Sequence, residues 1–144
     1  MVTNWLFGAL ALWLVIWQVA PIIGVRKHTA KAVQDLLERG AVTVVDVRPR
    51  AEYVSGHIPQ SQSIPLAEVR QKIIDIDRSK PVILVCRSGY RAMQAFHILK
   101  RRGFKGHGVL QGGIIAWEAL RAQQSRAGEL VRPTKDEKHY DSSI

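Results

Sequence analysis

One stretch of this chain, residues 80–91, constrains the possible fold more than any other. Within it the short apolar run Val82–Val85 is typical of a β-strand that is buried on both faces of a sheet. From Arg91 onward, apolar side chains recur at helical spacing until Gly103, which predicts a helix over that range. Cys86 therefore lies at the end of a buried parallel strand, just before a tight turn and a helix.

The turn after Cys86 is expected to make its thiol reactive. Ser88 and Gly89 supply the turn, and the first N–H groups of the next helix have no partners within that helix. The helix dipole and the side chains of Arg87 and Arg91 add positive charge at the same point. We therefore expect the thiol to ionise readily and the loop to hold an anionic group. The alternative is an inert apolar cysteine at a strand end.

Composition restricts the kinds of site that the chain can form. Cys86 is the only cysteine in 144 residues, which rules out an internal disulfide and a four-cysteine zinc site. The histidines show no metal-ligand spacing, and we expect no metal and no cofactor. The net charge of +9 comes from scattered basic residues without a nucleic-acid-binding motif. We therefore expect it to attract anionic substrates or lipid head groups and not nucleic acid.

The remaining patterns predict alternating strands and helices. Thr29 is expected to cap a helix that stops at Gly40, and apolar runs predict strands at 41–47 and 107–110. Residues 63–65 are expected to form an edge strand, because they include a proline. Further helices are expected at 51–55, 66–74 and 114–120. This order predicts a parallel α/β sheet with helices on both faces and a site at the carboxyl end of a central strand.

Several polar residues and glycines are expected to support the site. Asp46 and Arg48 end the strand at 41–47, and we interpret them as a buried pair that fixes the loop together with Glu52. Direct catalysis by these residues is the alternative. His57 is a candidate general base, although a structural hydrogen bond is favoured. The pair Gly112-Gly113 is expected to let the backbone pass close to another element.

Together these pieces resemble the rhodanese (thiosulfate sulfurtransferase) domain family, from Thr29 to Leu120. The motifs that carry the resemblance are Val44-Val45-Asp46-Val47-Arg48, Glu52-Tyr53, Gly56-His57-Ile58-Pro59, Ile64-Pro65, Cys86–Arg91, and Leu110-Gln111-Gly112-Gly113 followed by Trp117. The chain departs from the family at Gln60, where glycine followed by alanine is usual. The resemblance implies the rhodanese-like fold, a parallel sheet flanked by helices.

The resemblance also implies a reaction. Cys86 would take a sulfane sulfur from a small anionic donor such as thiosulfate, become a persulfide, and pass the sulfur to a thiol or protein acceptor. The cradle for the substrate would be formed by Arg87, Ser88, Gly89, Tyr90 and Arg91. Four residues separate Cys86 from Arg91, whereas dual-specificity phosphatases have five, so a phosphatase or arsenate reductase is disfavoured. A persulfide carrier or protein-docking module with little turnover is the other alternative.

The N-terminal segment Trp5–Val25 contains no charged residue. As a helix it is about 31 Å long, which matches a hydrocarbon core of about 30 Å. Because Arg26, Lys27 and Lys31 follow it, we predict a single-pass anchor in the inner (plasma) membrane with the domain in the cytoplasm. A cleaved signal peptide and a buried core helix are the alternatives. The predicted organisation is an anchor at 1–26, a rhodanese-like domain at 27–122 and a flexible basic tail at 123–144.

Overall fold

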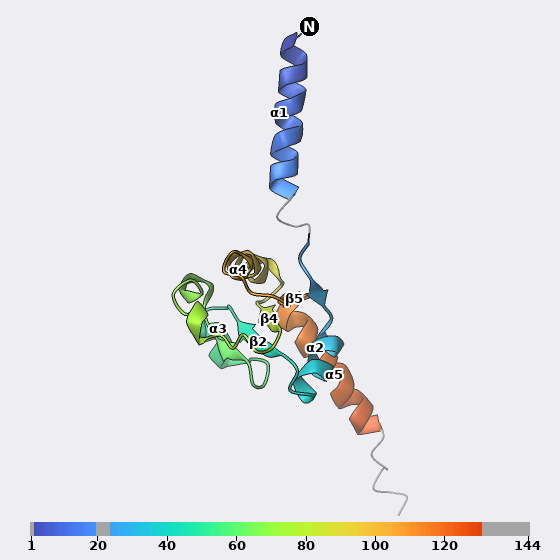
Figure 1. Cartoon of the computed structure of the whole chain (residues 1–144). Coiled ribbons are helices and arrows are strands. Elements are labelled where there is room, and N and C mark those ends of the chain that lie inside the picture. Colours follow the sequence, from blue (N-terminus) through green and yellow to red (C-terminus); the bar gives the residue numbers. More distant parts are fainter. Residues whose placement is uncertain (1, 20–23, 131–144) are drawn as a thin grey trace, which may run out of the picture.

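A sheet of five parallel strands forms the centre of the domain. The computed structural model describes residues 2–19 and 24–130 (Figure 1). In spatial order the strands are β1 (Lys27–His28), β5 (Gly108–Leu110), β4 (Val82–Val85), β2 (Thr43–Asp46) and β3 (Gln62–Ser63). Every neighbouring pair is parallel. The predicted parallel sheet, the central place of Val82–Val85 and the edge strand near residue 63 are therefore confirmed.

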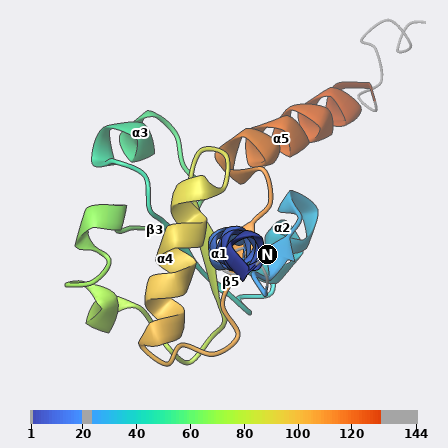
Figure 2. The same ribbon diagram turned by 90° about the horizontal axis from the view of Figure 1, so that it is seen from above.

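Helices cover both faces of this sheet. Two of them, α2 (Ala30–Glu38) and α5 (Gly113–Leu130), contact each other on one face, as Figure 1 and Figure 2 show. On the other face α4 (Tyr90–Arg101) packs on β4 and β5. The short helix α3 (Arg50–Ser55) follows β2. The helix predicted at 66–74 is wrong: this segment forms two 3₁₀ turns, η2 (Leu66–Glu68) and η3 (Ile73–Asp75).

Alternate residues of the central strands enter two separate apolar cores. The core on the α4 side contains Val45, Val47, Val82 and Leu84, together with Cys86. The core between the sheet and the α2–α5 pair contains Val44, Ile83 and Val85. Because both faces of β4 are covered, all four of its side chains are buried, which explains its uninterrupted apolar sequence.

The structure changes some of the predicted boundaries. Thr29 caps α2 as predicted, because its hydroxyl oxygen accepts a hydrogen bond from the N–H of Ala32 at 3.3 Å. The predicted end of the last helix at Leu120 is wrong, since α5 continues to Leu130. Residues 121–130 include alanine, arginine, glutamine and glutamate, which favour helix. The first part of the predicted tail at 123–144 is therefore helical, and its remainder lies outside the described residues.

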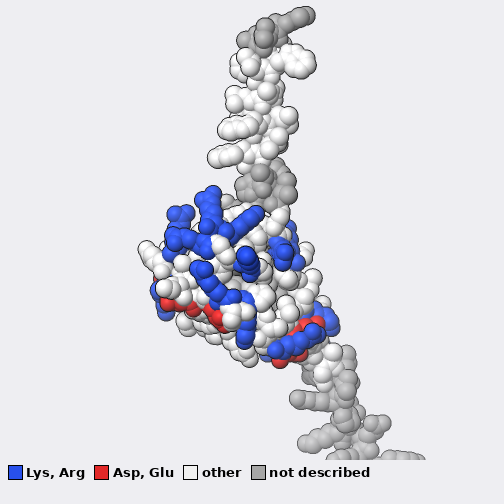
Figure 3. Space-filling model, in the orientation of Figure 1, with Lys and Arg blue, Asp and Glu red and all other residues white. Residues whose placement is uncertain are grey.

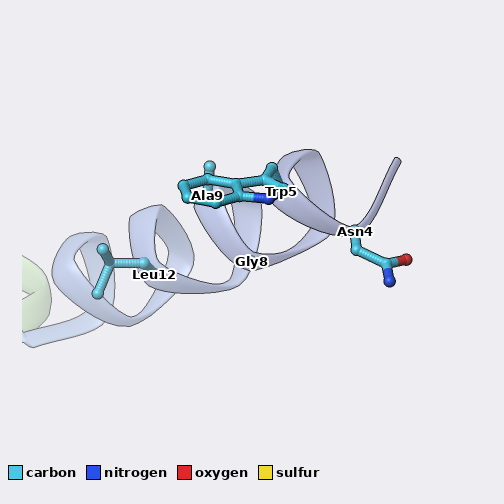
Figure 4. A pocket seen from close by; sticks show the side chains of 5 residues that line it. All are labelled: Asn4, Trp5, Gly8, Ala9 and Leu12. Atoms are coloured by element: carbon cyan, nitrogen blue, oxygen red, sulfur yellow. The ribbon is translucent and has the colours of Figure 1, made fainter. Parts of the chain in front are cut away.

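The helix α1 (Val2–Val19) precedes the domain, and its side chains are largely apolar. No helix in residues 2–19 or 24–130 combines the length and the apolar character that a membrane crossing requires. The anchor predicted at Trp5–Val25 is therefore not supported: α1 is about 27 Å long, and residues 20–23 lie outside the description. Figure 4 shows a hollow along α1 that is lined by Asn4, Trp5, Gly8, Ala9 and Leu12. None of these five residues has an ionisable side chain.

Candidate active site

The thiol of Cys86 lies inside a tight loop between β4 and α4. Only 1% of the residue is exposed. The N–H of Gly89 donates a hydrogen bond to the Cys86 sulfur, with 3.0 Å between nitrogen and sulfur. Gly89 has a φ of 119°, a left-handed value that turns the chain back over the sulfur and starts α4. The sulfur thus accepts a backbone hydrogen bond from the residue that starts α4.

The loop that leads from β5 into α5 packs against the cysteine loop. A side chain at Gly113, whose φ is 58°, would overlap the carbonyl groups of Cys86 and Arg87. The N–H of Ile114 donates to the Cys86 carbonyl oxygen at 2.8 Å, and the N–H of Ile115 donates to that of Arg87 at 3.5 Å. The close approach predicted for Gly112-Gly113 is therefore confirmed, and its partner is the cysteine loop itself. The start of α5 holds this loop in place.

Arg91 leaves the loop and forms an ion pair with α3. Its two terminal nitrogens donate to the two carboxylate oxygens of Glu52 at 3.2 and 3.3 Å. About a third of each side chain is exposed. The sequence assigned Glu52 to the pair of Asp46 and Arg48, but the structure pairs it with Arg91. The ion pair fixes the direction of the Arg91 guanidinium at the edge of the loop.

Asp46 and Arg48 form the buried ion pair that the sequence predicted. The Arg48 guanidinium donates to both carboxylate oxygens of Asp46, at 2.7 to 3.0 Å, and to the carbonyl oxygen of Gly56 at 2.7 Å. The hydrogen bond to Asp46 raises the pKa of Arg48. These contacts join the end of β2 to the end of α3, which supports the structural interpretation of the pair.

His57 occupies an exposed position beside Tyr53. Its Nδ1 atom lies 2.9 Å from the Tyr53 carbonyl oxygen, and the two rings stack with centroids 3.9 Å apart. The Tyr53 hydroxyl donates to the carbonyl oxygen of Ser61 at 2.6 Å. These contacts agree with a structural role for His57. Among the described residues, no cluster of three or more histidine, cysteine or carboxylate side chains could hold a metal ion.

The structure brings most of the predicted site residues to the carboxyl end of the sheet. Ser88, Gly89 and Tyr90 line a pocket of about 290 Å³ beside the sulfur loop. The pocket also contains Lys27 and Met93, which the sequence did not place at the site. Only the fold reveals them, because Lys27 comes from β1 and Met93 from the first turn of α4.

Arg87 adds an exposed positive charge to the loop after Cys86. Figure 3 shows that Lys and Arg side chains outnumber Asp and Glu on the visible face of the domain, which contains the C-terminal end of α4 and not the start that follows Cys86. Arg87 is exposed, and the described residues form no ion pair with it. An exposed cation without a counter-charge attracts small anions toward the loop.

Comparisons with known proteins agree with this geometry. The family model described as "Rhodanese-like domain" matches residues 29–120. The thiosulfate sulfurtransferase GlpE of Pseudoalteromonas translucida is 30% identical over 90 residues, which cover 62% of this chain and 86% of that protein. A sulfurtransferase of Allochromatium vinosum is 36% identical over 84 residues, covering 58% and 78%. The crystal structure of a rhodanese-related protein from Thermoplasma volcanium has a TM-score of 0.61 and 30% identity, covering 66% and 92%.

Proposed function

Because the chain belongs to the rhodanese-like domain family, we propose that it is a sulfurtransferase in which Cys86 carries the transferred sulfur. One observation carries the proposal: the only thiol of the chain accepts a backbone hydrogen bond at the centre of a loop that two other elements hold in place. The relatives named sulfurtransferases support sulfur transfer in general. We further propose that the sulfur donor is thiosulfate or a persulfide.

The first half of the reaction loads the cysteine. The Cys86 thiolate attacks the outer sulfur of thiosulfate, and a bond forms between that sulfur and Sγ. The S–S bond of thiosulfate breaks, and its electron pair leaves with sulfite. The Gly89 N–H stabilises the negative sulfur before and after this step, and the positive end of the α4 dipole adds to the effect. Arg87 attracts the dianion to the loop.

The second half returns the thiolate. An acceptor thiol attacks the outer sulfur of the Cys86 persulfide, and the bond between this sulfur and Sγ breaks with its electron pair on Sγ. The acceptor leaves as a persulfide that carries the proton of its thiol. No cofactor takes part in either half of this scheme.

The burial of Cys86 favours a second candidate, a persulfide carrier that loads sulfur but turns over slowly by itself. With 1% of the residue exposed, a loaded sulfur would be shielded from free acceptors in solution.

The two candidates are tested with the purified full-length chain, thiosulfate and cyanide. For a sulfurtransferase we expect steady formation of thiocyanate, which Cys86→Ser abolishes. Intact-protein mass spectrometry should show one added sulfur atom on the wild-type chain and none on Cys86→Ser. Loading without turnover would support the carrier. Absence of loading from thiosulfate and from persulfide donors would refute both.

We also propose, from the sequence, that the domain is held at the cytoplasmic face of the inner membrane. Support comes from the uncharged segment Trp5–Val25 and from the cations Arg26, Lys27 and Lys31 that follow it. Alkaline carbonate extraction of cell membranes tests this localisation: the full-length chain should stay in the pellet. Recovery in the supernatant would contradict it.

A further inference from the structure

The pocket beside the cysteine loop has a largely apolar lining, which the binding of thiosulfate does not require. Its floor and walls are largely apolar and come from the first turn of α4 and the ends of β5 and β1. Polar groups are few, and the only full charge among its lining residues belongs to Lys27. The complete lining is Lys27, Ser88, Gly89, Tyr90, Met93, Val109, Leu110, Gln111 and Gly112. We call this space the acceptor pocket.

Strand pairing explains why Lys27 reaches this pocket. β1 lies beside β5 in parallel register, with Lys27 opposite Val109. Val109 packs into the apolar core on the α4 side of the sheet. Paired residues of neighbouring strands point to the same face, so the Lys27 side chain lies on the α4 side as well. None of the ion pairs within the described residues involves Lys27.

We propose that the acceptor pocket binds a small acceptor thiol with an apolar body and a carboxylate. This inference rests on the proposed sulfur transfer and names the substrate class of its second half. The apolar body lies against Tyr90 and Met93, and the carboxylate lies near the Lys27 ammonium group. The thiol then reaches across Gly89 to the sulfur carried by Cys86, because Gly89 borders both the pocket and Sγ.

Two other occupants fit the pocket less well. Thiosulfate is small, doubly charged and strongly hydrated, so it gains nothing from the apolar groups of Tyr90 and Met93. A protein acceptor would bury a surface much larger than this space, and it would not need an apolar hollow of about 290 Å³. A volume of this size, with few polar groups, is instead typical of a small organic ligand.

The chemical step balances with the groups already named. The Cys86 persulfide begins as the anion, with its charge on the outer sulfur, and the acceptor enters as a neutral thiol. The thiol proton moves to the outer sulfur while the acceptor sulfur attacks it. The bond between the outer sulfur and Sγ breaks, and its electron pair leaves Cys86 as the thiolate. The product is the protonated persulfide of the acceptor, and no external oxidant or reductant is needed.

The test compares two acceptors that differ only in charge. The full-length chain is loaded with thiosulfate, freed of excess donor, and mixed with 6-mercaptohexanoate or with 6-mercapto-1-hexanol. We expect the second-order rate constant of sulfur transfer to the acid to exceed that for the alcohol about fivefold, the effect of one exposed ion pair. Lys27→Ala should remove this preference and Lys27→Arg should retain it. The preference should also shrink in about 1 M salt, where exposed charges are screened.

A matched variant at another lysine separates the pocket from general surface charge. Lys105 is exposed and lies in the loop that leads into β5, at the opposite end of that strand from Gln111. Lys105→Ala should leave the preference for the acid unchanged. An equal loss in both alanine variants, or equal rates for both acceptors in the wild-type chain, would overturn the inference. A wild-type chain that loads sulfur but shows no preference overturns only the acceptor pocket, whereas a chain that never loads overturns the proposed function too.

Discussion

Replacing Gly113 by alanine tests whether the start of α5 holds the cysteine loop. Gly113 has a φ of 58°, and a Cβ atom there would overlap the carbonyl groups of Cys86 and Arg87. Gly40 provides the matched control, because it has a φ of 63° and no atom within 4 Å of the position that its Cβ would take. The two substitutions therefore share the backbone strain, and only Gly113→Ala adds a collision with the site.

The free-energy difference between the two variants follows from these contacts. Alanine in a left-handed conformation costs about 1–2 kcal/mol, and both variants carry this cost. At Gly113 the chain must also move the Cys86 loop, which adds an overpacking cost of about 1–3 kcal/mol. The hydrogen bond from Ile114 to the Cys86 carbonyl oxygen is lost as well, at about 1 kcal/mol. We therefore expect Gly113→Ala to lose about 2–4 kcal/mol more stability than Gly40→Ala.

Urea unfolding followed by circular dichroism measures this difference in the folded domain. The same samples should differ in the reactivity of Cys86 toward a disulfide reagent in the absence of urea. The thiol should react faster in Gly113→Ala, since the displaced loop uncovers a sulfur that is buried in the wild type. Equal losses of stability in the two variants, with unchanged thiol reactivity, would refute the idea that Gly113 supports the loop.

Three further substitutions test the surroundings of the site. Glu52→Gln keeps a hydrogen-bond acceptor for Arg91 but removes a negative charge, so the KM for thiosulfate in steady-state assays should fall about threefold; a rise would contradict this. Asp46→Asn leaves Arg48 buried without a counter-charge and should lower the free energy of unfolding in urea by about 3–5 kcal/mol, with partial recovery when Arg48→Met is added. Burial lowers the pKa of His107 below its ordinary value of 6.5. As the pH falls, His107 of the unfolded chain therefore takes up a proton at a higher pH than His107 of the folded chain. Stability measured in urea should therefore decrease below about pH 6.5, and His107→Phe should flatten that slope.

The central part of the fold could be predicted because its signals are local. Val82–Val85 is an uninterrupted apolar run, and the spacing after Arg91 is helical, so the position of Cys86 at a strand end follows from neighbouring residues alone. β1 could not be found in this way. It has only two residues, Lys27 and His28, both polar, and its pairing with β5 depends on the order of strands in the sheet.

The partners of the charged groups were harder to predict than their positions. The sequence grouped Glu52 with Asp46 and Arg48 because they are close along the chain. In the fold β2 lies beside β4, which brings α3 near the start of α4, and Glu52 pairs with Arg91, 39 residues away. The backbone conformation at Gln60 was also hard to predict, since the resemblance expects glycine there. Its φ of 65° shows that the left-handed turn is kept without glycine.

The two arginines of the cysteine loop have different roles, because only Arg91 has an ion-pair partner among the described residues. Arg91 is held by two hydrogen bonds to Glu52, so its charge is largely balanced and its direction is fixed. Arg87 is exposed and has no ion-pair partner among the described residues, so its charge is free to attract an anion. The N–H of Gly89 contacts the sulfur itself. In the proposed transfer from a dianion this separation has a use: the exposed cation attracts the donor and releases the sulfite product, while the hydrogen bond to the Cys86 sulfur persists through the whole cycle.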